Sequence, residues 1–341
     1  MTTNGKVHYV GVDDGHYAIK VCTEEGKTFS VPSRGRVGRH VISWRENDDN
    51  GFYSTEEGQS YTVNPYLTQY DDTRFKEYPK SALNRVLVHH ALFRAGFGGK
   101  NVSIATGLPV SYYYLADGSQ DEALINAKIA NLSKKVTAGG DLVLANIQKS
   151  FVATEAIAAY FDYLINMDGS PSEHYDELAD STVGVIDIGG KTTDCAVILP
   201  GGNQVVMERS GSSDVGVLQL HANIESKLRA EFDLDNVPPA MIESAIARGI
   251  VKISGKEEAV GELVREQKIK LADDIIAGVR PKIGSGKDLD FVLFVGGGAI
   301  VMKDQLGKYF AHSRFPENPE FANARGMLKI AKYIVGGEAQ A

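Results

Sequence analysis

The sequence contains few cysteines and no long apolar stretch. Of its 341 residues only two are cysteines, Cys22 and Cys195, and both lie in segments with the pattern of buried strands. Two such thiols give no reason to expect disulfide bonds and favour a reducing compartment. The first residues lack the apolar core of a signal peptide, and no apolar run approaches the length that spans a bilayer. We therefore expect a soluble, cytoplasmic protein without membrane contact.

The sequence also contains fewer basic than acidic residues. The chain has 36 lysines and arginines against 44 aspartates and glutamates, which gives a formal net charge of −8. A protein that binds DNA through a broad basic face has the opposite balance, so we expect DNA to be reached only indirectly, through another protein. The hydrophobic content of 43% is ordinary for a globular protein. The length is sufficient for two domains of usual size.

The strongest signal is in residues 183–199, VGVIDIGGKTTDCAVIL. Two runs of β-branched and apolar residues flank a short turn that contains Gly189 and Gly190. Glycine lets the backbone approach a ligand closely and turn its N–H groups toward an anion. Asp187, at the end of the first run, is placed to hold a cation or a water beside that anion. An ordinary hairpin with a polar tip has the same local pattern, so a second signal is needed.

That signal is a repeat of the pattern near the N-terminus. Residues 7–22, VHYVGVDDGHYAIKVC, again lead from an apolar run through Asp13 and Asp14 to Gly15 and a returning apolar run. A single D-x-G turn is common, but two such hairpins lie about half a chain apart. They predict two similar half-proteins that close around one nucleotide, each offering a hairpin to its phosphates.

A third element lies in residues 290–300, DFVLFVGGGAI. A buried-type strand runs into Gly296, Gly297 and Gly298 and then into a helical segment. A tight connection between strand and helix needs one glycine rather than three. Three small residues form a platform on which a flat base or a ribose can lie, and the start of a helix suits an anion. We therefore expect these glycines to contact the nucleotide.

These segments resemble the five-motif nucleotide site of the actin/Hsp70/sugar-kinase superfamily and, within it, the plasmid-segregation actins of the ParM (StbA) family. The resemblance rests on VDDGHYAIK (12–20), VHHAL (88–92), TGLPVSYYY (106–114), TEAIAAY (154–160), DIGGKTTD (187–194), VGGGA (295–299) and NARGM (323–327). It implies an α/β fold of two similar actin-like, ribonuclease H-like domains around a nucleotide cleft. Domain I is expected at 1–165 plus 320–341, with a small subdomain inserted at about 33–80, and domain II at 166–319.

The resemblance also implies roles for single residues. The expected nucleotide- and phosphate-binding residues are Asp14, Gly15, Lys20, Gly189, Gly190, Lys191, Thr192, Gly296, Gly297 and Gly298. Asp13 and Asp187 are expected to bind Mg²⁺ through water. Glu155 and Asp187 are expected to be catalytic, with Glu155 orienting the attacking water. The chain departs from the family pattern at His16 and Tyr17, which stand where small hydroxyl residues are usual.

Three local interpretations accompany these roles. The apolar spacing predicts a helix over residues 151–165 with Glu155 in its first turns, a position that the helix dipole alone also favours for a glutamate. Residues 135–147 are expected to form a pair of strands turned at Gly139 and Gly140. A group of arginines at Arg34, Arg36 and Arg39 fits either a filament contact or a solvated loop.

From the resemblance we expect a bacterial actin-like ATPase that uses ATP, ADP and Mg²⁺. It would polymerise with ATP into filaments of itself. The filaments would segregate plasmid DNA through an adaptor protein of the ParR (StbB) kind, bound to a centromere site. The alternatives are a sugar or acid kinase of the same superfamily and a chromosomal actin-like cytoskeletal protein.

The sequence offers little support for the rivals. A kinase needs an acceptor site with its own aspartate, and we find no such motif after the first hairpin. A chaperone ATPase needs a substrate-binding domain, for which the residues after the last connecting helix leave no room. Membrane-bound actins often carry an amphipathic end, whereas this chain ends in the polar EAQA.

Overall fold

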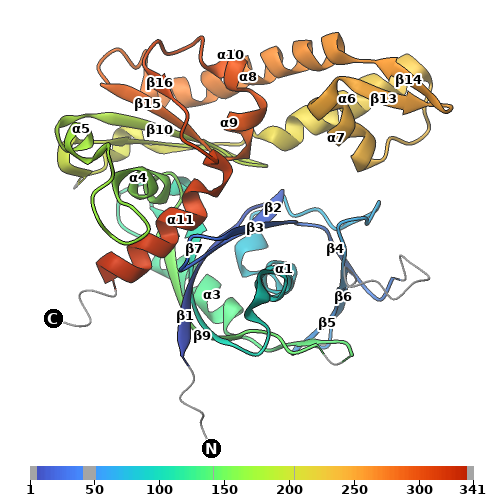
Figure 1. The fold of residues 1–341 in the computed structure, drawn as a ribbon, viewed down its shortest axis with the longest axis horizontal. Coiled ribbons are helices and arrows are strands. Elements are labelled where there is room, and N and C mark those ends of the chain that lie inside the picture. Colours follow the sequence, from blue (N-terminus) through green and yellow to red (C-terminus); the bar gives the residue numbers. More distant parts are fainter. Residues whose placement is uncertain (1–5, 41–50, 141, 203, 336–341) are drawn as a thin grey trace, which may run out of the picture.

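The computed structural model describes residues 6–40, 51–140, 142–202 and 204–335. Within these ranges each half of the chain forms a five-stranded sheet (Figure 1). The first has the order β3 (Thr28–Pro32), β2 (Ala18–Thr23), β1 (Val7–Asp14), β7 (Asn101–Leu108) and β9 (Asn146–Thr154). The second has the order β12 (Gly211–Ser213), β11 (Thr193–Ile198), β10 (Val183–Ile188), β15 (Phe291–Val295) and β16 (Ser313–Arg314).

The two sheets share one design, as the repeated hairpin predicts. In each, a central strand pairs antiparallel with the strand that follows it and parallel with a strand much later in the chain: β1 with β2 and β7, and β10 with β11 and β15. Every residue of β10 and β11 is buried, which agrees with their continuous apolar sequence. The two-domain α/β fold expected from the sequence is confirmed.

Smaller sheets and helices complete each half. A four-stranded sheet in the first half has the order β4 (Gly35–Val37), β6 (Ser60–Val63), β5 (Gly51–Thr55) and β8 (Val136–Ala138), and β13 (Ile250–Ile253) pairs with β14 (Lys256–Ala259) in the second. The helices are α1 (Ala82–Leu92), α2 (Val110–Tyr113), α3 (Glu122–Leu132), α4 (Ile157–Leu164), α5 (Tyr175–Asp180), α6 (Val217–Phe232), α7 (Pro239–Arg248), α8 (Gly261–Ile283), α9 (Gly297–Val301), α10 (Lys303–Leu306) and α11 (Ala322–Lys329).

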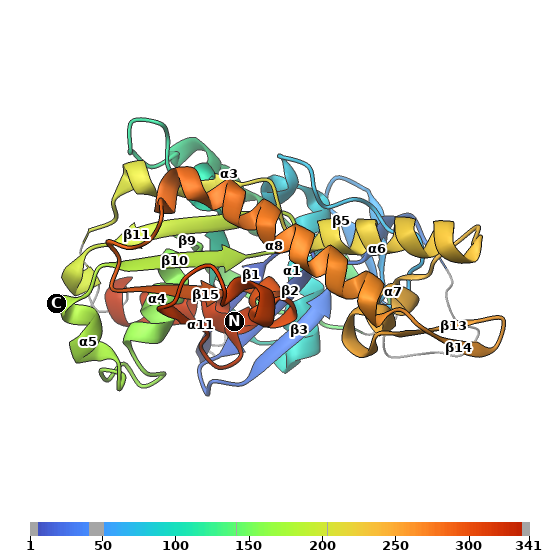
Figure 2. The ribbon, with the colours of Figure 1, turned by 90° about the horizontal axis from the view of Figure 1, so that it is seen from above.

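Each sheet is covered by helices that bury its apolar face. Figure 2 shows the long α8 lying across the second sheet, with α6 alongside it. Ile186 and Phe294 of that sheet join Ile275 of α8 in one buried cluster. In the first half, Val10 of β1 and Val86 of α1 belong to a separate cluster. Each half thus has a main core of its own, as two domains require, and a third cluster packs Ala159 of α4 against Val185 of β10.

The domains are joined where α4 and α11 lie side by side between the two sheets (Figure 1). The helices approach so closely that a side chain on Gly326 of α11 would overlap the carbonyl of Ala158 in α4. Asp162 of α4 accepts hydrogen bonds from Arg325 at 2.6 Å and from Lys329 at 2.6 Å, both on α11. This junction connects the two halves beneath the cleft between them.

Two local expectations are wrong. Residues 151–154 continue strand β9, because they pair in parallel with residues 105–108 of β7, and α4 begins only at Ile157. Glu155 therefore lies in the turn between strand and helix. The second error concerns residues 135–147, where β8 pairs with β5 and β9 pairs with β7 instead of the two pairing with each other. In both cases partners distant in sequence determine the structure, and local spacing does not reveal them.

The structure leaves the expected domain boundaries untested and bears on the expectations for the cysteines and for membrane helices. The boundaries proposed for the domains and for the small subdomain at about 33–80 remain predictions, and residues 41–50 of that subdomain lie outside the described residues. Cys22 on β2 and Cys195 on β11 are buried and unpaired. Among the helices of the described ranges, none is long and apolar enough to cross a membrane.

Candidate functional site

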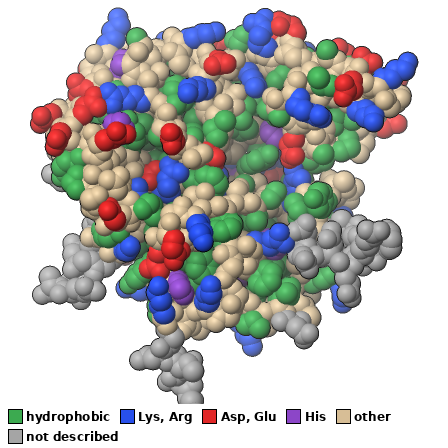
Figure 3. All heavy atoms as spheres, in the orientation of Figure 1, with side chains coloured by type: hydrophobic (Ala, Val, Ile, Leu, Met, Phe, Trp, Pro, Cys, Tyr) green, Lys and Arg blue, Asp and Glu red, His purple; other side chains and the backbone are tan. Residues whose placement is uncertain are grey.

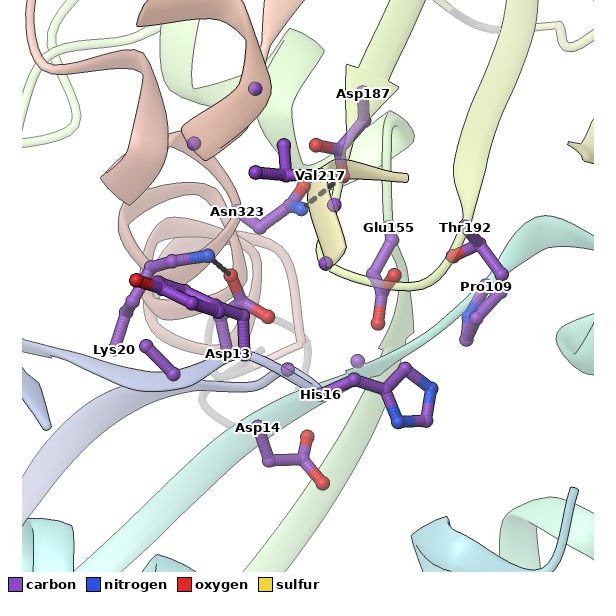
Figure 4. A pocket seen from close by; sticks show the side chains of 18 of the residues that line it. Asp13, Asp14, His16, Lys20, Pro109, Glu155, Asp187, Thr192, Val217 and Asn323 are labelled. Carbon is purple, nitrogen blue, oxygen red and sulfur yellow. Dashed lines mark hydrogen bonds and ion pairs between the residues drawn. The ribbon is translucent and has the colours of Figure 1, made fainter. Parts of the chain in front are cut away.

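The turns of the two hairpins meet across the cleft between the domains. The turn after β1 carries Gly15, His16 and Tyr17, and the turn after β10 carries Gly189 and Gly190. A Cβ atom on Gly190 would lie 2.8 Å from the Cβ of Tyr17 and 3.0 Å from its backbone nitrogen. Only glycine permits this approach. Residues of both turns line one cavity (Figure 4).

Three of the predicted carboxylates and one predicted lysine are brought together in this cavity. Asp13, Lys20, Glu155 and Asp187 all line it, and Figure 4 shows Glu155 and Asp187 on the side opposite Asp13 and Lys20. Lys20 donates to Asp13 at 2.8 Å. Burial by itself would lower the pKa of Lys20, but Asp13, Asp187 and Glu155 raise it above its usual value. The lysine therefore stays charged.

The carboxylates hold more negative charge than Lys20 offsets. Burial first, and then Asp13 and Asp194, raise the pKa of Asp187 to about 7. Burial and the neighbouring carboxylates raise the pKa of Glu155 well above its usual value. Burial raises the pKa of Asp194 to about 6. Carboxyl groups that resist ionisation together are typical of a site that receives a cation.

A hard divalent cation suits this donor set, because carboxylate oxygens and water are the ligands that Mg²⁺ prefers. Within the described ranges, however, no three acidic, histidine or cysteine side chains are close enough to ligate one ion directly. The geometry is compatible with the expectation that Asp13 and Asp187 act through water. That role remains a prediction.

Asn323 belongs to the segment NARGM, which matches the second connecting helix of the family, but no role at the site was expected for it. Its amide nitrogen donates to Asp187 at 2.5 Å, and its amide oxygen accepts from the backbone N–H of Ala156 at 3.2 Å. One side chain on α11 thus fixes both Asp187 and the turn that carries Glu155. Ala156 has φ of 63°, an uncommon conformation for alanine that this bond helps to hold.

Asp14 lines the cavity but its carboxylate is occupied inside domain I. It accepts hydrogen bonds from Asn84 at 2.6 Å, Lys128 at 2.8 Å and Thr106. Burial opposes ionisation of Asp14, and Lys128 and these hydrogen bonds outweigh it and hold its pKa below the usual value. The predicted nucleotide contact of Asp14 is untested. Lys128 lies on α3 in a segment without any motif, so its contact with Asp14 could not be predicted.

The three glycines after β15 differ in whether the surrounding structure leaves room for a side chain. A Cβ on Gly296 would overlap Asp187 and the backbone of Ile188, and one on Gly298 would overlap the Ile188 side chain. A Cβ on Gly297 would meet no atom within 4 Å. Gly297 and Gly298 line the cavity, whereas Gly296 is not among its lining residues. Packing thus accounts for two of the glycines, and Gly297 leaves space on the cavity side.

The second hairpin contributes Gly189, Gly190 and Thr192 to the cavity, and Lys191 is not among the lining residues. The carbonyls of Gly189 and Gly190 accept from the first N–H groups of α6 at 3.0 and 2.9 Å. The Thr192 hydroxyl donates to Asp194 at 3.1 Å. Asp194 also accepts from the backbone N–H of Val110 in domain I at 3.0 Å. Asp194 therefore ties the predicted phosphate turn to the other domain.

The mouth of the cleft is bridged by two further contacts between the domains. The rings of Tyr17 and His221 meet edge to face at a centroid distance of 5.2 Å. Arg34 donates to Glu243 of α7 at 2.7 Å and to the carbonyl of Pro65 at 2.6 Å. Arg34 is therefore a contact across the cleft, which the sequence did not indicate.

The other two arginines of that group are held within domain I. Arg36 donates to Gln69 at 3.1 Å, and the Arg39 guanidinium lies 4.9 Å from the centre of the Phe52 ring. On the face shown in Figure 3, basic and acidic side chains are interspersed instead of forming one basic area. The expectation that DNA is contacted only indirectly remains a prediction.

Comparison with protein families matches the two halves of the chain to two models. Residues 8–166 match the N-terminal part of the plasmid segregation protein ParM, and residues 185–308 match the C-terminal part of the archaeal MreB-like actin homologues. Among curated proteins, an archaeal actin homolog of Thermoplasma volcanium is 25% identical over 340 residues, covering 95% of this chain and 98% of that protein. The archaeal actin homolog of Thermoplasma acidophilum is 24% identical over the same length.

Solved structures give the same result for the fold. An archaeal actin homolog in complex with ADP has a TM-score of 0.76 and 23% identity, with 96% of this chain and 99% of the other covered. A ParM from a 15-stranded filament of Clostridium botulinum has a TM-score of 0.75 and 18% identity, with the same coverage. The actin-like, two-domain fold is supported over nearly the whole chain, and the resemblance to ParM is supported over residues 8–166.

Proposed function

We propose that this chain, an actin-like ATPase of the ParM and archaeal actin-homologue type, polymerises into filaments when ATP and Mg²⁺ occupy the cleft between its domains. The observation that carries the proposal is the meeting of two glycine turns from different domains over one cavity. That cavity also contains Lys20 and an excess of carboxylates. A polyphosphate with a bound divalent cation complements both features, since the turns suit phosphate and the carboxylates suit the cation.

Different residues of the chain would bind the phosphates, hold the cation and orient the attacking water. Backbone N–H groups of the two turns and the Lys20 ammonium group bind the phosphates, and Gly297 leaves room for the nucleoside. Asp13 and Asp187 would hold Mg²⁺ through water, and the ion would supply positive charge beside the phosphates. Glu155, in the turn fixed by Asn323, orients the attacking water and accepts a hydrogen bond from it.

Filament assembly can depend on nucleotide because the nucleotide site lies between the two domains. Ligands that contact both turns favour one angle between the domains, and a surface made of both domains then has one shape. Head-to-tail contacts between identical chains that do not close into a ring produce filaments. The relatives include a ParM solved as a filament, which supports self-assembly as the output of ATP binding.

The finer proposal is plasmid segregation. The match of residues 8–166 to the plasmid segregation protein ParM supports it. The net charge of −8 favours contact with centromere DNA through an adaptor protein of the ParR kind. The match of residues 185–308 to archaeal MreB-like proteins supports a second candidate, a cytoskeletal filament without plasmid cargo. Loss of plasmid retention on deletion of the gene, with unchanged cell shape, is the result expected for segregation.

The ATPase assignment is tested by separating binding from hydrolysis. We expect Glu155→Gln to bind ATP within a few-fold of wild type and to release phosphate at least a hundredfold more slowly, because it cannot act as a base. Glu177→Gln is the matched control, since Glu177 lies on α5 and pairs with Arg314 outside the cavity. Equal phosphate release by Glu155→Gln and the control would remove the catalytic role. Absence of ATP binding by the wild-type protein would overturn the proposal itself.

A further inference from the structure

The first hairpin turn carries a histidine whose orientation is fixed by a distant segment. The His16 Nδ1 atom lies 2.8 Å from the carbonyl oxygen of Thr73, and the Thr73 hydroxyl donates back to the carbonyl of His16 at 2.8 Å. The imidazole also packs on the ring of Tyr78, with the centroids 4.9 Å apart. Two contacts therefore hold the ring, and the third holds the backbone of His16.

The anchor determines which nitrogen carries the proton. A carbonyl oxygen only accepts hydrogen bonds, so Nδ1 must be the donor, and in the neutral ring Nε2 then has a lone pair. None of the described residues forms a hydrogen bond with Nε2. His16 lines the same cavity as Glu155 and Thr192, and Figure 4 shows its ring projecting from the turn toward Glu155 and Pro109.

We propose that His16 is a phosphate-binding residue that donates a hydrogen bond from Nε2 to the nucleotide, so that nucleotide binding takes up a proton. The inference rests on the proposed function, because it assumes that the cavity binds a nucleoside polyphosphate. Phosphate oxygens accept hydrogen bonds, and Nδ1 is already used. The ring can therefore contact phosphate only as imidazolium, with protons on both nitrogens.

The charges around His16 keep it neutral until the phosphate arrives. Burial lowers its pKa most, Lys191 and Lys128 lower it further, and the Thr73 carbonyl and Asp14 oppose them, which leaves a pKa of about 4. Asp72, in the segment that contains Thr73, is close enough to interact electrostatically with His16 and is paired with Arg74. A bound polyphosphate adds several negative charges beside the ring and raises the pKa of His16.

The direction of the pH dependence follows from this change. The pKa of His16 is higher in the complex than in the free protein, so protonation of His16 strengthens binding. That contribution is fully present below the free value of about 4 and is lost as the pH rises through the pKa of the complex. A small hydroxyl residue at this position binds phosphate without such a dependence.

The test uses calorimetric titration of the full chain with Mg²⁺ and a slowly hydrolysed ATP analogue at pH 7. Titrations in two buffers of different ionisation enthalpy give the number of protons taken up. His16→Asn retains an N–H in the place of Nδ1–H, which preserves the bond to Thr73, but has no donor in the place of Nε2. We expect it to take up fewer protons than wild type and to bind about tenfold more weakly, the usual effect of one charge-assisted hydrogen bond.

A second variant and a control keep the result specific to His16. His16→Gln carries an uncharged N–H near the position of Nε2, so we expect it to lose the proton uptake while retaining more of the affinity. His221→Asn is the matched control, because His221 lines the same cavity and burial also lowers its pKa to about 4. It should keep the wild-type proton uptake.

The outcomes distinguish the two proposals. Proton uptake that is equal in wild type and both His16 variants would overturn the role of His16, and so would a loss confined to His221→Asn. A merely structural role of His16 predicts weaker binding without any change in proton uptake. If the wild-type protein binds no nucleotide, the proposed function fails instead.

Discussion

At the scale of single residues, the cavity is arranged for a ligand at the expense of stability. Asp187 is buried beside Asp13, and its pKa is raised to about 7. The folded protein therefore binds more protons than the unfolded chain between the usual pKa of an aspartate and about 7. By linkage, its stability without nucleotide falls as the pH rises through that range. Destabilising charge clusters of this kind are common at functional sites.

The substitution Asp187→Asn tests whether the buried charge of Asp187 lowers stability while supporting ATP hydrolysis. The amide removes the buried charge and still offers an oxygen to the Asn323 amide group, which donates to Asp187 at 2.5 Å. We expect the nucleotide-free variant to be more stable than wild type at pH 8, by on the order of 1–2 kcal/mol, and to hydrolyse ATP at least tenfold more slowly. Urea unfolding and phosphate release measure the two effects. A variant that is both less stable and fully active would contradict this account.

Turnover should also depend on pH through Glu155. Burial, Asp194 and Asp13 raise the pKa of Glu155 well above its usual value, and only the ionised form can take a proton from the attacking water. We therefore expect kcat to increase with pH near neutrality and to level off once Glu155 is ionised. A kcat profile at saturating Mg·ATP measures this, and a flat profile in a protein with normal turnover would exclude Glu155 as the base.

At the scale of elements, two neighbouring glycines at the start of α9 differ: Gly298 is packed against protein atoms, and Gly297 has free space beside it. A Cβ on Gly298 would overlap Ile188, whereas a Cβ on Gly297 would meet nothing within 4 Å. We expect Gly298→Ala to lose about 1–3 kcal/mol of stability through overpacking. Gly297→Ala should unfold like wild type and bind ATP several-fold more weakly. Thermal unfolding and ATP titration of both variants test this. Equal ATP affinity of Gly297→Ala and wild type would place the nucleoside elsewhere.

The sequence predicts those elements whose information is local. Both hairpins and the strand before Gly296 follow from apolar runs and glycine turns, and the structure contains them as β1–β2, β10–β11 and β15. The strand from 151 to 154 could not be predicted this way, because its pairing with β7 involves residues more than forty positions away. The helical spacing of its apolar residues favours the wrong structure.

The same limit applies to the site. Asp13, Lys20 and Asp187 lie on the strands of two recognisable hairpins, whereas the contacts of Lys128 and Asn323 form only on folding. Lys128 is a lysine in an ordinary amphipathic helix until α3 places it against Asp14. Asn323 reaches Asp187 across 136 residues of sequence. No local pattern encodes contacts of this kind.

At the scale of the whole molecule, the domains are held together above and below the cavity. Below it, α4 and α11, in which Asp162 pairs with Arg325 and Lys329, lie between the two sheets. Above it, Tyr17 contacts His221, and Arg34 contacts Glu243. We therefore expect these upper contacts to influence the release of the proposed nucleotide more than its hydrolysis.

Glu243→Gln should therefore accelerate nucleotide release. The pair is partly exposed, with 45% of the Glu243 side chain accessible, so we expect a modest two- to fivefold increase, in line with about 0.2–1 kcal/mol for such ion pairs. Stopped-flow release of a fluorescent ADP measures it. Arg36→Ala is the matched control, because Arg36 lies two residues from Arg34 but bonds to Gln69 in its own domain. The double charge swap Arg34→Glu with Glu243→Arg should restore slow release, and equal acceleration by the control would refute the contact's role.

The central claim is that ATP in this cleft drives assembly of the chain into filaments. Light scattering of the purified protein after addition of Mg·ATP, over a series of protein concentrations, tests it most directly. We predict a rise only above a critical concentration, followed by decay as ATP is consumed, and a rise without decay for Glu155→Gln. A flat trace at all concentrations, in a protein that hydrolyses ATP steadily, would contradict the claim and favour a small-molecule kinase.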